Sequence, residues 1–268
     1  MLNGISQNSL NSAQTALATS LARLSTASRI NSAKDDAAGL AISSAMGAQL
    51  GSDNQAIRNV YDGLSLTSVA EGALGQATES LQRIRELSVQ AANGTNSASD
   101  RQAIQGEISQ LQQGLGQLMD TTQFNGQKLF DGSFSRQLQT GPNAGNTSAL
   151  SLSKVSPETL GVATIDVTTA SGANDALVAV DNALTSLNGE RSQIGALQSS
   201  LSSTLANLQG TYVNLSAAKS RITDTDYAAE TGNLARNKVQ QQAATQALAL
   251  YNQNQSSVLS LLGPALRG

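Results

Sequence analysis

The residues with the greatest chemical potential are the consecutive charges Lys34-Asp35-Asp36, which contain the one pair of adjacent acidic residues in the chain. Two carboxylates can share general acid and base work if both enter one pocket. Neighbouring residues on a helix point in different directions, however, so this pair is poorly arranged for that work. The chain has no histidine and no cysteine, which excludes imidazole bases, thiolate nucleophiles and zinc sites built on those ligands. We therefore expect no enzyme, no metal and no cofactor.

The composition predicts long, thin helical elements instead of an enzyme core. Charged residues make up 13% of the 268 residues and aromatic residues 3%. Small and polar residues dominate, which suits helices that pack closely together. The net charge is −3 with both signs interspersed, so no basic stripe indicates a nucleic-acid partner. No apolar run reaches membrane-spanning length and the first residues lack a general secretory signal, so we expect no membrane partner.

The periodicity of the leucines predicts a mainly α fold with long antiparallel helices. Asn93-Gly94 should end the first long core helix, because both residues tolerate the left-handed cap conformation. Ser99, with Gln102 three residues on, resembles a capping box that begins the next helix. The expected core helices span residues 41–93, 99–120 and 174–222. Near the N-terminus the expected apolar seam consists of Leu10, Leu17, Leu21 and Leu24.

The centre of the chain, residues 121–170, is expected to be a small β-hairpin element. It holds all three phenylalanines and two hairpin-type turns, Asn125-Gly126 and Asp131-Gly132. Alternation of apolar and polar residues predicts further half-exposed strands. The alternating positions are Leu150, Leu152, Ile165 and Val167.

The two ends of the chain carry narrow apolar stripes among many Gln, Asn and Ser residues. An isolated helix of this kind is marginal in water, because it cannot offset the entropy lost on ordering. Both ends are therefore expected to need another surface, most simply other copies of the same chain.

Several segments, in the same order along the chain, resemble bacterial flagellins. Arg29–Ser43 is similar to the N-terminal signature of that family, and Leu81–Gln90 to its core-domain helix. Thr122–Gly126 resembles the entry into the family's β-hairpins. Ser220–Ala228 and Val258–Leu262 resemble its C-terminal signature. The match departs at Ala27-Ser28, where the family more often has Gly with a larger residue, and in the tail after the last leucines.

The resemblance implies a short flagellin without the variable outer domains. Residues 1–40 plus 226–268 would form an inner coiled-coil domain and residues 41–225 a core domain. Such a chain polymerises into the extracellular flagellar filament for motility, after export by the flagellar type III route without a cleaved signal peptide. The implied partners are other copies, the filament cap and hook-junction proteins, an export chaperone and the host toll-like receptor for flagellin.

Two sets of residues carry specific expectations from the resemblance. Gln82, Arg83, Leu87 and Glu107 match the positions that face the receptor in flagellins, with Arg83 and an exposed Leu87 as anchors. Polymerisation is expected to use residues near both ends and in the charged triplet. These are Leu17, Leu24, Lys34, Asp35, Asp36, Leu248, Leu259 and Leu262.

Two other classes remain open from the sequence. A hook–filament junction protein is a flagellin relative with similar ends that does not form long filaments. Some flagellins carry a protease insert, but that insert needs zinc-binding histidines, which this chain lacks.

Overall fold

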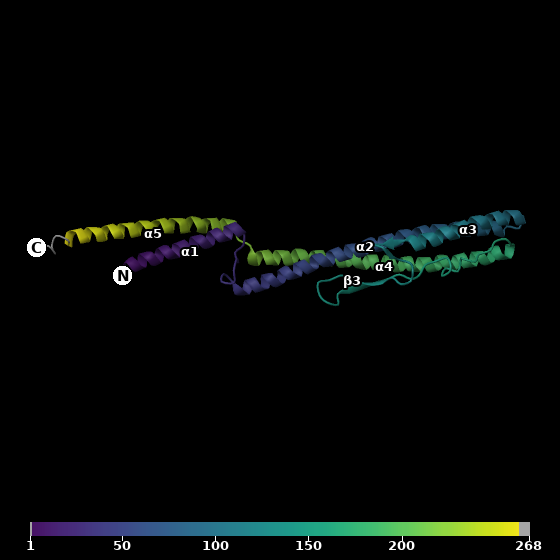
Figure 1. Ribbon diagram of the computed structural model, residues 1–268, viewed down its shortest axis with the longest axis horizontal. Helices are drawn as coiled ribbons and strands as arrows, with labels where there is room; N and C mark the ends of the chain where they lie inside the picture. Colours follow the sequence, from purple (N-terminus) through teal and green to yellow (C-terminus); the bar gives the residue numbers. More distant parts are fainter. Residues whose placement is uncertain (1, 263–268) are drawn as a thin grey trace. The chain divides into compact units, whose positions relative to one another are not determined.

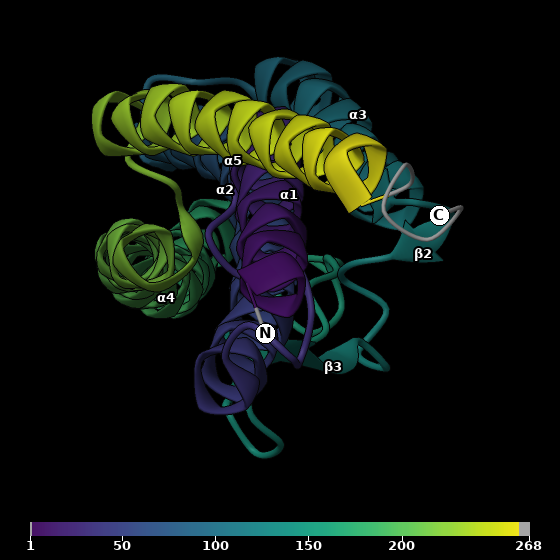
Figure 2. The same cartoon turned by 90° about the vertical axis from the view of Figure 1, so that its left-hand side faces the viewer.

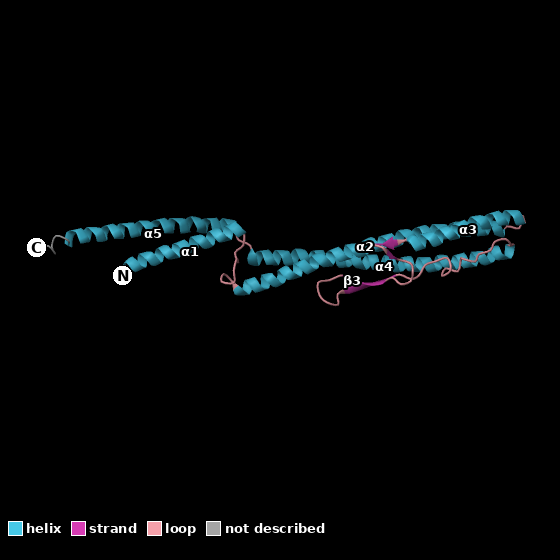
Figure 3. Ribbon diagram, in the orientation of Figure 1, coloured by secondary structure: helices cyan, strands magenta, loops and turns pink. Residues whose placement is uncertain are grey.

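The computed structural model describes residues 2–262, and the side chains of residues 7–257. The described residues form five helices: α1 (Leu2–Thr26), α2 (Ala37–Ala92), α3 (Ala98–Thr121), α4 (Ala170–Thr223) and α5 (Tyr227–Leu262) (Figures 1 and 3). The predicted mainly α fold is confirmed. α2 ends at Ala92, next to the predicted stop at Asn93-Gly94, but neither of these two residues has a left-handed φ angle, so the predicted left-handed cap is not formed.

The cap of α3 lies two residues earlier than the sequence indicates. Ser97, not Ser99, is the N-cap residue, and its side chain accepts a hydrogen bond from the backbone N–H of Asp100. The Asp100 carboxylate in turn accepts one from the backbone N–H of Ser97 at 2.9 Å. This reciprocal arrangement is the capping box with Asp in place of Gln or Glu. The prediction of a box at Ser99 and Gln102 is therefore wrong.

Four short strands form two antiparallel hairpins. β1 (Gln123–Phe124) pairs with β2 (Gln127–Lys128), and β3 (Ser135–Gln139) pairs with β4 (Thr147–Ser151). The predicted strand at Ile165 and Val167 is not formed. That backbone is held instead by one side chain of α3, because Gln105 donates to the carbonyl of Ile165 at 3.0 Å and accepts from the N–H of Val167 at 2.7 Å.

The chain divides into two compact units, residues 51–212 and the two chain ends up to Leu50 and from Val213. The expected domain boundaries at residues 40 and 226 remain a prediction. In the unit of residues 51–212, one cluster of buried side chains joins α2, α3, α4 and the hairpin region. Two ion pairs fix α2 against α4, Arg191 with Glu71 at 2.7 Å and Arg85 with Asp181 at 2.7 Å. The later residue of α2, Arg85, pairs with the earlier residue of α4, Asp181, so the two helices are antiparallel, as predicted.

The unit of the chain ends consists chiefly of α1 and α5, which lie side by side (Figures 1 and 2). Beyond α1, a short antiparallel bridge joins Ser28 to Asp224. Arg29 strengthens it, since its backbone N–H donates to the carbonyl of Thr223 at 2.6 Å and its guanidinium to the carbonyl of Ile222 at 2.8 Å. Residues near the two ends of the chain are therefore tied together within one copy.

Candidate interaction sites

The contact between α1 and α5 is an antiparallel seam with heptad spacing. Buried and half-buried positions of α1 recur every three or four residues, the pattern of a coiled-coil contact. The positions at this spacing are Leu10, Ala13, Leu17, Ser20 and Leu24, and half-buried Ala16, Thr19 and Arg23 flank them. Seven positions of α5 recur in the same way. They are Glu230, Leu234, Asn237, Gln241, Ala244, Leu248 and Tyr251. Leu17, Leu24 and Leu248 therefore lie in the seam, as expected, whereas Leu21 is 52% exposed and does not belong to it.

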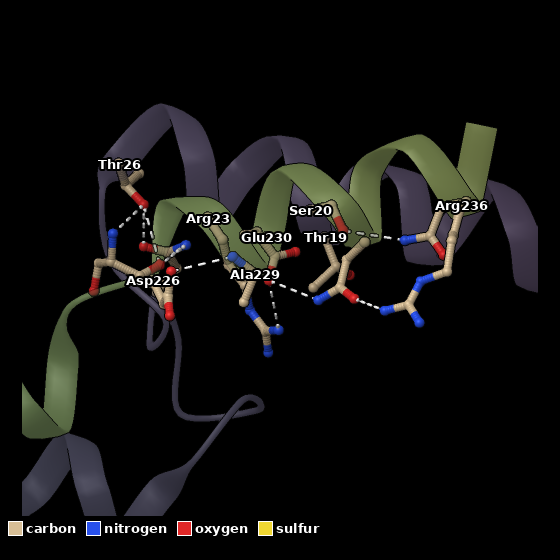
Figure 4. Close-up of polar contacts among 12 residues, drawn as sticks. Thr19, Ser20, Arg23, Thr26, Asp226, Ala229, Glu230 and Arg236 are labelled. Carbon is tan, nitrogen blue, oxygen red and sulfur yellow. Dashed lines mark hydrogen bonds and ion pairs between the residues drawn. The ribbon is translucent and has the colours of Figure 1, made fainter.

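One end of this seam carries polar side chains that contact one another, as Figure 4 shows, and two of them are buried. Ser20 is 3% exposed and Glu230 is 6% exposed. The amide of Asn237 donates to the Ser20 hydroxyl at 3.1 Å, and the Glu230 carboxylate lies 3.8 Å from the guanidinium of Arg23. The phenol of Tyr227 closes the layer by donating to the carbonyl of Leu24 at 2.9 Å.

These contacts, which we call the polar layer, specify the register in which α1 and α5 pair. If α5 slid by one heptad, Asn237 would take the place of Glu230, and Ala244 the place of Asn237. Arg23 would then lose its carboxylate and Ser20 its amide donor. Leaving a buried polar group without its partner costs about 1–3 kcal/mol, so the observed register is favoured.

The side of α5 away from the seam carries large apolar side chains in contact with solvent. Val239 is 64% exposed and Leu250 is 61% exposed. On α1, Leu21 is exposed to a similar degree. Large apolar side chains left exposed on paired helices are sites that another protein chain can cover.

The charged triplet forms the turn that leads into α2. The Asp35 carboxylate accepts hydrogen bonds from the backbone N–H groups of Asn31 and Ser32 at 3.1 and 2.9 Å, and from the Ser32 hydroxyl. These bonds, the hydroxyl's foremost, lower the pKa of Asp35. Asp36 caps α2 by accepting from the N–H of Gly39 at 2.8 Å. Both carboxylates thus act within one chain.

Lys34 differs from its two acidic neighbours. It is exposed, and it forms no ion pair within the part of the chain that the structure describes. A role of the triplet between subunits remains a prediction, and Lys34 is the member available for it. The side chains of Leu259 and Leu262 lie outside the described residues, so their expected role also remains a prediction.

The four residues expected to face the receptor do not all lie on the surface. Gln82 is exposed, and the exposed Arg83 guanidinium bridges Glu107 of α3 at 2.9 Å and Glu86 at 3.1 Å. Leu87 is only 2% exposed and packs in the core cluster of α2, α3 and α4. The expectation that Leu87 is an exposed anchor beside Arg83 is therefore wrong. Residues four apart share a helix face only approximately, and this face turns inward between them.

Neither an ion site nor a membrane span emerges from these elements. In residues 2–262 no group of three or more acidic side chains is placed to hold a metal ion. No helix within the same range is long and apolar enough to cross a bilayer. The fold and its surfaces define a helical structural protein whose two ends pair and whose paired helices expose apolar side chains.

Family comparisons agree with this class and make it specific. The model of the bacterial flagellin N-terminal helical region matches residues 1–135, and that of the C-terminal helical region matches residues 177–262. The chain belongs to the bacterial flagellin family, whose members are structural subunits of the flagellar filament. A flagellin of Halalkalibacterium halodurans is 44% identical over 90% of this chain and 89% of its own length. Flagellin FlaB2 of Treponema pallidum is 36% identical over 96% of both chains.

Solved structures show related folds. The crystal structure of Bacillus cereus flagellin has a TM-score of 0.52 at 28% identity, over 60% of this chain and 94% of that one. A putative flagellar hook-associated protein from Vibrio parahaemolyticus has a TM-score of 0.62 at 16% identity, over 71% of this chain and all of that one. The second likeness shows the fold alone.

Proposed function

We propose that copies of this chain add to a growing flagellar filament through the paired helices α1 and α5. The observation that carries the proposal is the exposure of Val239 and Leu250 on a helix whose other side is already covered by α1. Apolar area of this kind contributes to association when a neighbour covers it. The exposed amide and hydroxyl groups around it can pair with the same groups of the neighbour.

A head-to-tail contact between identical copies gives an open helical polymer when its rotation does not close a ring. The chain would reach the growing tip through the flagellar export route, with an export chaperone covering its ends beforehand and the filament cap and hook-junction proteins as its other partners. The absence of cysteine suits this route, because no crosslink can form during passage.

The second candidate is a hook–filament junction protein. The fold it would need is shared with the hook-associated protein and so does not separate the two classes, whereas the 44% identity to a flagellin over most of the chain opposes it. Seeding separates the two. Purified chain added to short filament fragments should lengthen them, as seen by electron microscopy. Capped fragments that stop after one layer would favour the junction protein.

We also propose that Gln82, Arg83 and Glu107 form a surface for the flagellin-sensing toll-like receptor. Arg83 and Glu107 side chains are 51% and 47% exposed, and their ion pair presents a fixed pattern of charge. Leu87 would support this surface from beneath.

A reporter-cell assay with single variants tests the receptor proposal. Arg83→Ala should lower potency roughly thirtyfold, the worth of about 2 kcal/mol at an interface anchor. Arg85→Ala is the matched control, because Arg85 is equally exposed but pairs with Asp181 of α4. Equal potency of wild type and Arg83→Ala, with wild type clearly active, would place the receptor contact elsewhere.

A further inference from the structure

The turn between α2 and α3 contains a dipeptide that can modify itself. In an Asn-Gly pair, the backbone nitrogen of the glycine can attack the side-chain amide carbon of the asparagine, since no side chain on the glycine crowds the approach. The sequence holds four such pairs. They are Asn3-Gly4, Asn93-Gly94, Asn125-Gly126 and Asn188-Gly189.

The nucleophile of the second pair is available. α2 ends at Ala92, and the backbone N–H of Asn93 still donates to the carbonyl of Gln90 at 3.2 Å, whereas Gly94 lies beyond the helical hydrogen bonds. The backbone N–H of Gly94 has no acceptor among the loop hydrogen bonds of the described chain, and Gly94 is exposed. A Cβ atom placed there would meet nothing within 4 Å. The nitrogen is therefore free to approach the neighbouring side chain.

The electrophile of the same pair is already polarised. The backbone N–H of Thr95 donates to Oδ1 of Asn93 at 3.2 Å. When the side-chain carbon is attacked, Oδ1 gains negative charge, and a donor fixed beside it stabilises that charge. The guanidinium of Arg101 holds the backbone of the same turn, because it donates to the backbone carbonyls of Ala91 at 2.9 Å and Asn93 at 3.1 Å.

The other pairs are held in less favourable settings. Asn188-Gly189 lies inside α4, where backbone N–H groups donate along the helix, and Asn3-Gly4 lies inside α1. Asn125 and Gly126 have left-handed φ angles of 49° and 75° and are fixed between β1 and β2. Within residues 2–262, neither the side chain of Asn125 nor that of Asn188 accepts a hydrogen bond from a following backbone N–H, as the side chain of Asn93 does.

We propose that Asn93 is a site of spontaneous deamidation. The nitrogen of Gly94 bonds to Cγ of Asn93, the bond from Cγ to the amide nitrogen breaks, and ammonia leaves with the proton from Gly94. Water then opens the five-membered succinimide to aspartate or isoaspartate. The reaction needs no oxidant or cofactor. It places a new carboxylate at the C-terminal end of α2, where the helix dipole disfavours an anion and Arg101 partly compensates.

Incubation of the full-length chain at mildly alkaline pH, followed by trypsin, tests the proposal. Cleavage after Arg85, Arg101, Lys128, Lys154 and Arg191 puts the last three pairs on separate peptides, residues 86–101, 102–128 and 155–191. Fragmentation by mass spectrometry and isoaspartate labelling locate the product. In the folded chain, Asn93 should convert roughly tenfold faster than Asn125 and Asn188. In denaturant the three rates should converge, because the structural differences are removed.

Two variants sharpen the test. Gly94→Ala has open space for its methyl group, so the chain should fold normally while conversion at Asn93 slows several-fold. Gly189→Ala is the matched control and should leave the peptide 86–101 unchanged. Equal rates at Asn93 and Asn125 in the folded chain, or the same ratio in folded and denatured chain, would overturn the proposal.

Discussion

Leu138 of β3 lies directly over Gly63 of α2, so closely that a Cβ atom at position 63 would come within 2.4 Å of Cδ2 of Leu138. Beside them, the amide of Asn59 donates to the carbonyl of Gln139 at 2.9 Å. Leu138 also packs against the cluster that joins Val60 of α2 to α4. Gly63 and Leu138 thus form one of the close contacts by which the second hairpin packs on α2.

Gly63→Ala should displace this hairpin. The added methyl group cannot be accommodated without moving Leu138, and overpacking of this kind costs typically about 1–3 kcal/mol. Urea unfolding of the full chain measures the loss, and amide exchange of residues 135–151 should speed up. Gly72→Ala is the matched control in the same helix, where a methyl group meets nothing within 4 Å. It should stabilise by about 0.5–1 kcal/mol. The same response from both variants would show that close packing at Gly63 is unimportant.

Gln105→Ala should release the segment around Ile165 and Val167. The variant removes both hydrogen bonds of the Gln105 amide, and each buried backbone group left without a partner costs about 1–3 kcal/mol. Amide exchange of residues 162–169 should accelerate, whereas exchange in α4 should change little. The exposed Gln110 of α3 offers a control, since Gln110→Ala is expected to be near neutral. Unchanged protection at Val167 in Gln105→Ala would refute this account of the segment.

The turn at residues 31–36 should loosen in acid. Hydrogen bonds from Ser32 and Asn31 lower the pKa of Asp35 below its ordinary value of 3.8. A depressed pKa in the folded state means that the stabilisation is complete above the unfolded pKa and is lost as pH falls through the folded one. The protection factor of the Ser32 amide, which compares its exchange rate with that of an unstructured peptide at the same pH, should therefore be steady above about pH 5 and fall below 3.8. Asp35→Asn should abolish that step, and a step of equal size in the variant would assign it to another group.

Breaking the polar layer should destabilise the α1–α5 pair. Glu230→Ala leaves Arg23 without its carboxylate, and we expect a loss of about 1–2 kcal/mol, because the pair is 3.8 Å apart and Arg23 is partly exposed. Arg23→Leu with Glu230→Leu should recover the loss, since apolar residues often replace a buried ion pair without cost. Amide exchange of Leu17 and Leu24 reports the opening of the pair. If the losses of Arg23→Leu and Glu230→Leu measured singly simply add in the double variant, Arg23 and Glu230 act independently.

Most helices and their ends follow from sequence signals that act locally. The Asn93-Gly94 pair marks the end of α2 and the periodic leucines predict the long helices α2 and α4, because turn residues and periodicity act through nearby residues alone. The position of the α3 cap was missed since Ser97 and Ser99 both fit, and an Asp three residues after Ser97 serves as well as a Gln.

The tertiary roles were harder to foresee. Nothing in the sequence around Gln105 shows that its side-chain amide bonds the backbone of Ile165 and Val167, as a neighbouring strand would, since these partners lie some sixty residues away. Leu87 was wrongly predicted to be exposed, because its spacing of four residues from Arg83 does not show which side of the helix packs against α3 and α4. The polar layer, by contrast, had a signal. Counting back by threes and fours from Tyr251 and Leu248 reaches Asn237 and Glu230.

Seeded growth of a variant with Val239→Asp and Leu250→Asp tests most directly whether the outer side of α5 is an assembly surface. Both positions are exposed in the single chain, so the variant should fold like wild type, with an unchanged circular dichroism melting curve. In a filament each carboxylate would be buried without a partner, at a cost of several kcal/mol. Val239→Ala with Leu250→Ala removes apolar area without adding charge and should only slow growth. We predict no elongation of seeds by the aspartate variant, measured by electron microscopy. Filaments of wild-type length from a folded aspartate variant would contradict the account.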